Sequence, residues 1–182
     1  LIFHLRTSRL YDTLERFILL QGKVVCVSES IRKQFLIKQR YDFLARPSDD
    51  KVVTIYDGRD LRKFINVDDP DRIKREFNLN GEKIIGIIGA IAKIKRQDLF
   101  LLIANEVKRH NSDIKFLIVG DTYSNHLKQI LYKHEIFRLC EELGLKNDVI
   151  FTGYRDDIPL LLKLIDILVV TSKREALGGV II

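Results

Sequence analysis

Residues 84–119, IIGIIGAIAKIKRQDLFLLIANEVKRHNSDIKFLIV, carry the pattern that decides the fold. A continuous apolar run at Ile84–Ile88 is followed by a segment with helical periodicity from Gln97 to His110, and then by a second apolar run at Lys115–Val119. Continuous apolar runs are expected of strands that are covered on both faces. The stretch therefore predicts a strand–helix–strand unit whose two strands run parallel.

The same alternation of strands and helices extends along the chain. Further strands are predicted at Val24–Val27, Val52–Ile55, Val149–Thr152 and Ile167–Val170. Further helices are predicted at Tyr11–Leu20, Glu29–Lys38, Asp71–Phe77, Asn125–Leu143 and Asp157–Leu164, with Ser28 and Ser124 as N-caps and Gly144 as a C-cap. The predicted fold class is α/β, a Rossmann-like parallel sheet with helices on both faces.

Length and composition allow a sizeable core in one or two domains, because the chain has 182 residues of which 46% are apolar. The polar stretch Ala45–Asp50 reads as a linker. It separates residues 1–46, predicted to be the incomplete end of an N-terminal domain, from residues 47–182, predicted to be a second, more complete domain. Since the sequence has no methionine and starts inside an apolar run, we expect it to be an internal piece of a longer protein.

Several classes of protein are disfavoured by the sequence. No apolar run reaches the roughly 18 residues that a membrane span needs, and the sequence predicts no signal peptide. Cys26 and Cys140 lie on apolar patterns and are expected to be reduced core thiols of a cytoplasmic protein. The four histidines do not have the spacing of metal ligands, so no metal site is predicted.

The net charge of +6 suggests an anionic partner, which would be nucleic acid, a membrane surface or a phosphorylated small molecule. Ligands of open α/β sheets bind beyond the carboxyl ends of the strands, and the loops there are basic. The cations that follow three of the predicted strands are Lys93, Lys95, Arg96, Arg155, Lys173 and Arg174. This arrangement favours a compact anion, because neither a basic face nor a set of stacking aromatics points to nucleic acid.

A helix expected just after Thr171-Ser172 would direct its first N–H groups into the same crevice, where Gly178 and Gly179 allow close approach. Other phosphate-binding motifs do not match. Gly86 and Gly89 do not make a Gly-x-Gly-x-x-Gly turn, and there is no Gly-Lys-Ser/Thr loop.

Taken in order, these motifs resemble the group 1 (family 4) retaining glycosyltransferases of the GT-B fold. The stretch Val24–Ser30 resembles the last strand and helix of that family's acceptor domain. The stretch Thr54–Phe64 resembles the segment that opens its donor domain, with Asp57 in place of the family's Asn before Gly58. The resemblance covers most of the chain.

The stretch Gly89–Asp98 resembles the loop in which an Arg and a Lys hold the donor diphosphate. The resemblance assigns this role to Lys95, with Gly89 and Arg96 beside it. Ala90 stands where the family has its Arg, and Arg96 or Lys93 are the residues that would compensate.

The stretch Asp148–Pro159 resembles the loop beside the nucleotide base, where backbone groups around Tyr154 and Arg155 would read the base edge. Two acidic residues follow, Asp156 and Asp157. We predict that they cap the next helix rather than bind the ligand.

The stretch Thr171–Gly178 resembles the family's Ser-x-x-Glu-x-x-Gly motif. By this resemblance Glu175 is the catalytic residue near the donor sugar, and the N–H groups of Leu177 and Gly178 meet the distal phosphate. The family's second glutamate would come directly after Ile182.

The function implied is transfer of a hexose from UDP-sugar or GDP-sugar to a glycan or lipid-linked acceptor, with retention and without a cofactor. The chain would be chiefly the donor-binding domain, inactive alone, of a cytoplasmic enzyme that associates peripherally with the inner face of the membrane. Two alternatives stay open: a nucleotide-sugar 2-epimerase of the same fold, and a non-catalytic nucleotide-sugar-binding or regulatory paralogue.

Overall fold

The structure is a computed structural model that describes residues 2–5, 22–39, 48–65, 70–123, 127–175 and 178–179. The chain forms two compact units. The first consists of Leu1–Arg59 with Glu175–Ile182, and the second of Asp60–Arg174.

The first unit contains a three-stranded parallel sheet of order β1-β2-β3, made of Ile2–Leu5, Lys23–Cys26 and Val52–Thr54. Helix α2 (Glu29–Gln39) buries Ile31 and Phe35 against Val24 and Cys26 of β2. The Ser28 hydroxyl accepts a hydrogen bond from the Ile31 amide at 3.2 Å, which confirms the predicted N-cap. A short 3-10 turn, η1 (Asp49–Lys51), precedes β3.

The second unit is built on a four-stranded parallel sheet of order β6-β5-β4-β7. The strands are β4 (Lys83–Ile88), β5 (Ile114–Val119), β6 (Val149–Gly153) and β7 (Ile167–Leu168). The helices are α3 (Arg62–Ile65), α4 (Pro70–Glu76), α5 (Gln97–His110), α6 (Leu127–Glu142) and α7 (Ile158–Leu164). The predicted α/β class is confirmed.

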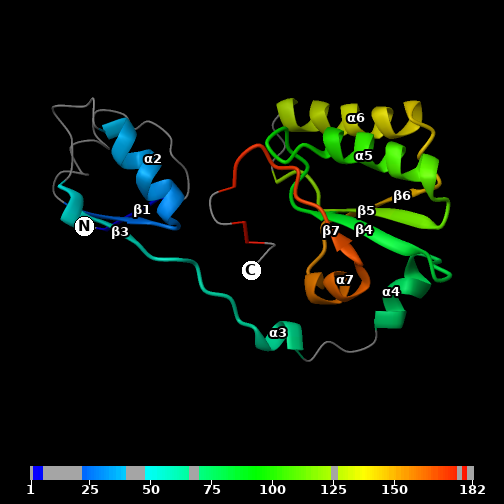
Figure 1. The fold of residues 1–182 in the computed structure, drawn as a ribbon, viewed down its shortest axis with the longest axis horizontal. Helices are drawn as coiled ribbons and strands as arrows, with labels where there is room; N and C mark the ends of the chain where they lie inside the picture. Colours follow the sequence, from blue (N-terminus) through cyan, green and yellow to red (C-terminus); the bar gives the residue numbers. More distant parts are fainter. Residues whose placement is uncertain are drawn as a thin grey trace. The chain divides into compact units, whose positions relative to one another are not determined.

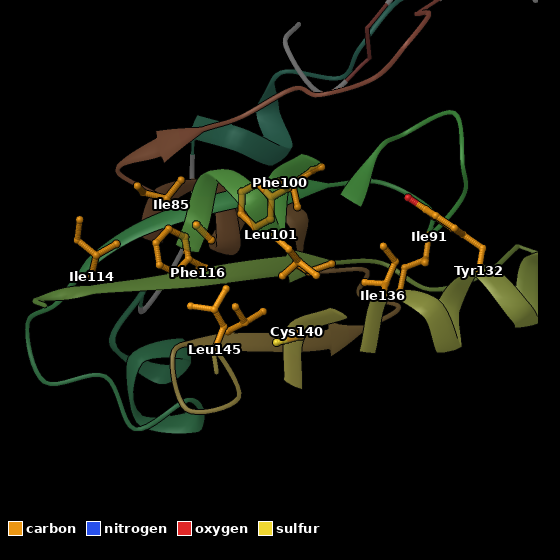
Figure 2. Close-up of a cluster of buried hydrophobic side chains, with 14 residues drawn as sticks. Ile85, Ile91, Phe100, Leu101, Ile114, Phe116, Tyr132, Ile136, Cys140 and Leu145 are labelled. Carbon is orange, nitrogen blue, oxygen red and sulfur yellow. The ribbon is translucent and has the colours of Figure 1, made fainter. Parts of the chain in front are cut away.

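Helices cover both faces of the β6-β5-β4-β7 sheet, with α5 and α6 on one face and α4 and α7 on the other (Figure 1). Successive side chains of β5 alternate between two cores because a strand turns its side chains to opposite faces. Phe116 packs with Phe100 of α5, whereas Leu117 packs with Ile73 of α4 and Leu161 of α7. Figure 2 shows the first of these cores, with Phe100 and Phe116 at its centre.

Other predicted helices and helix caps can be compared with the structure. Gly144 ends α6 as predicted, with φ 69° and with the Leu145 amide donating back to the Cys140 carbonyl at 3.0 Å. The predicted helix Tyr11–Leu20 and the predicted cap Ser124 lie outside the described residues. Strand β1 and the one-turn helix α3 were not predicted.

Two predictions differ from the structure. The predicted division after residue 46 falls too early, since β3 pairs with β2 and so belongs to the first unit. The helix expected just after Thr171-Ser172 does not form within described residues 171–175, where the Lys173 amide donates to the Ile94 carbonyl rather than to a helical partner. Described residues 178 and 179 are not helical either, and Gly178 has a left-handed φ of 69°. Among the described helices, none has the length and apolar character to cross a bilayer.

Candidate functional site

Three glycines end neighbouring strands at the carboxyl edge of the β6-β5-β4-β7 sheet. Gly89, Gly120 and Gly153 follow or close β4, β5 and β6, and all three have positive φ, at 153°, 130° and 69°. The Gly120 amide donates to the Gly153 carbonyl at 2.9 Å, and a Cβ on Gly120 would overlap the Gly89 carbonyl. These glycines therefore pack backbone against backbone and present an edge without side chains, which a ligand can approach closely.

Lys95 crosses this edge. Its backbone closes the turn after β4, where the Lys95 amide donates to the Ala92 carbonyl at 2.8 Å. Its side chain folds back over Gly89, with Cε 3.6 Å and Nζ 4.0 Å from the place where a Cβ of Gly89 would be. The structure thus brings together two of the residues assigned to the diphosphate, and puts an ammonium group beside the bare end of β4.

A buried amide shapes the turn that carries Lys95. Gln97, the first residue of α5, is fully buried. Its Nε2 donates to the Ala90 carbonyl at 2.9 Å, and its Oε1 accepts from the Ala92 amide at 3.4 Å. The Ile91 amide donates to the Asp121 carbonyl at 3.0 Å, which ties the turn to the end of β5. The sequence predictions included neither Gln97 nor Gly120, because both act through contacts that only the folded sheet creates.

Arg96 takes an unusual backbone conformation, with φ 56° and ψ 49°. This left-handed region is costly for residues other than glycine, so the surrounding contacts must hold Arg96 in it. The Arg96 Nε donates to both carboxylate oxygens of Asp98 at 3.0 Å, and the Tyr132 hydroxyl donates to Asp98 at 3.1 Å. Burial alone would raise the pKa of Asp98, but the hydrogen bonds from Arg96 and Tyr132 hold it below its usual range.

The side chains of Lys93 and Arg96 line a groove of about 450 Å³ beside α6. Lys93 Nζ lies 3.7 Å from the Glu135 carboxylate and 5.9 Å from the centre of the Tyr132 ring. Both residues that were expected to compensate for Ala90 are thus engaged with partners on α5 and α6. Their role at a diphosphate stays a prediction.

The loop after β7 is joined to the turn after β4. The Thr171 hydroxyl lies 2.7 Å from the Lys95 carbonyl and 3.0 Å from the Arg96 carbonyl, and the Lys173 amide donates to the Ile94 carbonyl at 2.8 Å. Since β4 and β7 are neighbours in the sheet, their following loops meet at the same edge.

The loop after β6 contains Tyr154 and Arg155. Tyr154 is 82% exposed, whereas the Arg155 side chain is only 17% exposed. The Arg155 guanidinium binds both Asp157 and Glu76, and it lies 5.7 Å from the centre of the Phe77 ring. These hydrogen bonds raise the pKa of Arg155 above its ordinary value. The side chain of Arg155 therefore fixes the loop to α4. The sequence predicted that backbone groups of this loop, not the Arg155 side chain, contact the nucleotide base, and that contact stays a prediction.

Asp157 occupies the N-cap position of α7, but its side chain makes no capping hydrogen bond. The prediction that it caps the helix with its carboxylate is wrong, because that carboxylate binds Arg155 at 2.7 and 2.8 Å and Arg72 at 2.8 Å. The hydrogen bond from Arg155 is the main reason that the pKa of Asp157 is lowered. Asp156 is exposed.

The remaining predicted residues belong to another part of the chain. Glu175 and Gly178 are grouped with the first unit, where Gly178 is buried and the Arg59 Nη2 donates to the Gly179 carbonyl at 3.2 Å. Leu177 lies outside the described residues. In the described part of the chain no His, Cys, Asp and Glu side chains gather in a way that would hold a metal ion.

Comparison with known proteins places this edge in a family. Residues 69–182, more than half of the chain, match the family model described as glycosyl transferases group 1. The chain belongs to the group 1 glycosyl transferases. The Lys95 turn, the Tyr154 loop and the Thr171 loop all lie within the matched range.

Two curated relatives of this group 1 chain are themselves named for transfer or synthesis of a glycoside. The N-acetyl-alpha-D-glucosaminyl L-malate synthase of Bacillus anthracis is 30% identical over 177 residues, which cover 94% of this chain and 41% of that protein. The 2-deoxystreptamine glucosyltransferase of Streptomyces kanamyceticus is 30% identical over 113 residues, which cover 60% of this chain and 27% of that protein. The chain spans less than half the length of these relatives.

Solved structures share the fold. A crystal structure of Anabaena HepE in complex with UDP and glucose superposes with a TM-score of 0.78 at 20% identity, covering 100% of this chain and 48% of that one. The C-terminal domain of a group 1 glycosyl transferase family protein from Francisella tularensis superposes with a TM-score of 0.54 at 26% identity, covering 65% of this chain and 60% of that one. The likeness at 20% identity shows the fold alone.

Proposed function

We propose that this chain is the donor-binding part of an enzyme that transfers a hexose from a nucleoside diphosphate sugar to a glycan or lipid-linked acceptor, with retention of configuration. One observation carries the proposal. The Lys95 ammonium lies over Gly89 at the carboxyl edge of the sheet, beside glycines that leave the backbone accessible. A diphosphate placed there would meet a cation and bare backbone together.

The reaction requires that the leaving diphosphate be stabilised as its negative charge grows. The bond between the anomeric carbon and the diphosphate oxygen breaks, a bond to the acceptor oxygen forms on the same face of the sugar, and the acceptor proton leaves with the diphosphate. The growing charge on the diphosphate is best stabilised by groups that are already in place, such as an ammonium held over the site. Lys95 has this role in the proposal, and Gly89 allows the phosphate to come close.

The other assignments follow from the family. Backbone groups of the Tyr154–Arg155 loop would contact the base, and Arg155 holds that loop through Glu76 and Asp157. Glu175 would act beside the donor sugar, with Gly178 and Leu177 toward the distal phosphate. UDP and UDP-sugars are the first ligands to test, because the Anabaena structure with the same fold was solved in complex with UDP and glucose. The net charge of +6 suits an acceptor at the anionic inner face of the cell membrane.

The test is calorimetric titration of the chain with UDP, GDP and their sugars, using wild type, Lys95→Ala and the control Lys146→Ala. Lys146 is a lysine 78% exposed in the loop that leads into β6, at the opposite edge of the sheet. Losing a charge-assisted hydrogen bond costs about 1.5–3 kcal/mol, so Lys95→Ala should weaken binding by about 10- to 150-fold.

Lys146→Ala should bind like wild type. In the full-length enzyme the Michaelis constant for donor should rise in parallel with the loss measured for Lys95→Ala. Absence of binding to every nucleotide tested, or equal affinities for the two lysine variants, would contradict the proposal.

A further inference from the structure

The hydroxyl group of Thr171 joins two loops that are far apart in sequence. Thr171 lies just beyond β7, and its Oγ1 is 2.7 Å from the Lys95 carbonyl oxygen and 3.0 Å from the Arg96 carbonyl oxygen. One hydroxyl proton is thus shared between two acceptors. The Lys173 amide adds a hydrogen bond to the Ile94 carbonyl at 2.8 Å. We call residues 94–96 and 171–173, joined in this way, the loop clamp.

The turn that the loop clamp holds is not one that the chain adopts by local preference. Arg96 has left-handed backbone angles, which disfavour a residue with a side chain. Its carbonyl also accepts the Phe100 amide at 3.2 Å and so starts α5. The bonds from Thr171 therefore stabilise the turn where the chain leaves the loop and enters the helix.

The backbone of Lys95 is held on both sides of its Cα, and the loop clamp holds the carbonyl side. The Lys95 amide donates to the Ala92 carbonyl, and its own carbonyl accepts from Thr171. With the backbone held at both peptide groups, the remaining freedom is that of the side chain, which folds over Gly89. A small rotation of this turn would carry the ammonium away from the edge.

We propose that Thr171 is a positioning residue for the donor, whose hydroxyl sets the place of the Lys95 ammonium at the diphosphate. This inference rests on the proposed function, and Thr171 acts in it only through Lys95. Thr171 itself does not contact the diphosphate in this account. Its effect on affinity is therefore expected only where Lys95 is present.

The experiment is a double-mutant cycle for nucleotide binding. Thr171→Val keeps the shape and removes the hydroxyl, and Thr171→Ser keeps the hydroxyl. Each is measured in the wild-type chain and in Lys95→Ala, by calorimetry with UDP and with GDP. The control is Thr54→Val, which also removes a half-buried hydroxyl, the one that donates to Glu29 at 2.9 Å in the first unit.

Thr171→Val should weaken binding about five- to tenfold, the size of one ordinary hydrogen bond, and by less than about twofold in Lys95→Ala. Thr171→Ser and Thr54→Val should bind like wild type. An equal loss from Thr171→Val in both backgrounds, or no loss in either, overturns the inference. If the valine variant does not fold, Thr171→Ala replaces it, and failure of both to fold shows a role in folding and also overturns the inference.

Hydrogen exchange in the nucleotide-free chain separates failure of this inference from failure of the proposed function. Removing the hydroxyl should speed exchange of the Lys173 and Lys95 amides, while the Lys83 amide, which donates to the Asp113 carbonyl at the other end of β4, should not change. Unchanged exchange of the first two overturns the loop clamp even if nucleotide binds. If wild type binds no nucleotide, the proposed function fails, and the donor role of Thr171 fails with it whatever the exchange shows.

Discussion

Replacing Gln97 by methionine removes the amide that shapes the turn carrying Lys95. Gln97 is fully buried, with one hydrogen bond of 2.9 Å to the Ala90 carbonyl and a longer one of 3.4 Å from the Ala92 amide. Methionine has nearly the same length, so little cavity forms and the loss comes from the hydrogen bonds. An ordinary bond contributes about 1 kcal/mol and a buried group left without a partner costs about 1–3 kcal/mol, so we expect a loss of about 2 kcal/mol.

Urea unfolding followed by circular dichroism measures this loss. The midpoint should fall while the slope with denaturant stays the same, because the surface exposed on unfolding does not change. The matched control is Gln34→Met on α2, which breaks an exposed hydrogen bond of 3.2 Å from Gln34 to Ser30 and should change stability by less than about 0.5 kcal/mol. A Gln97→Met chain as stable as the Gln34→Met chain would refute the reasoning that the turn depends on this amide.

Three further predictions follow from burial and backbone geometry. Gly120→Ala should lower the free energy of unfolding in urea by at least about 2 kcal/mol, because its Cβ would overlap the Gly89 carbonyl. Gly144→Ala, with φ 69° and open space around the added Cβ, should lower it by about 1 kcal/mol, and equal losses would contradict the packing of Gly120 against Gly89. The pKa of Asp157 is lowered in the folded chain, so its stabilising effect is complete above the unfolded pKa of about 4 and is lost as pH falls through the folded pKa. The stability difference between wild type and Asp157→Asn, measured by urea unfolding, should therefore narrow from pH 7 to pH 3, and a constant difference would count against the ion pair with Arg155. Burial raises the pKa of the Cys26 thiol to about 11, so little reactive thiolate is present at pH 8. An aromatic disulfide reagent should therefore react with Cys26 only after urea unfolds the chain. Rapid reaction in the folded chain would show that the thiol is accessible.

The elements predicted best are those whose pattern is long and strongly periodic. Helix α5 runs from Gln97 to His110 as predicted, and β4, predicted at Ile84–Ile88, begins one residue earlier at Lys83. The four-residue strand β1 and the single turn α3 were missed, since so short a segment has too few residues to show a period.

The sequence predicted the parts of the site that depend on a single loop, but not the contacts between loops. Placing Lys95 after a strand was enough to expect it at the carboxyl edge. The contact of Gly120 with Gly89 depends on strand pairing, and the bond between Arg155 and Glu76 spans 79 residues, so neither has a local signal. Arg96 in a left-handed conformation is a case in which tertiary contacts override the local preference against a side chain there.

The central claim is that a nucleoside diphosphate binds at the carboxyl edge of the β6-β5-β4-β7 sheet, and amide chemical-shift mapping of the chain during titration with UDP tests it most directly. The account predicts saturable shifts at the amides of Gly89, Lys95, Gly120 and Gly153. It also predicts no shift at Lys83, which lies at the amino end of β4. Shifts confined to the amino edge, or no saturable shift at Gly89, Gly120 and Gly153, would contradict the account.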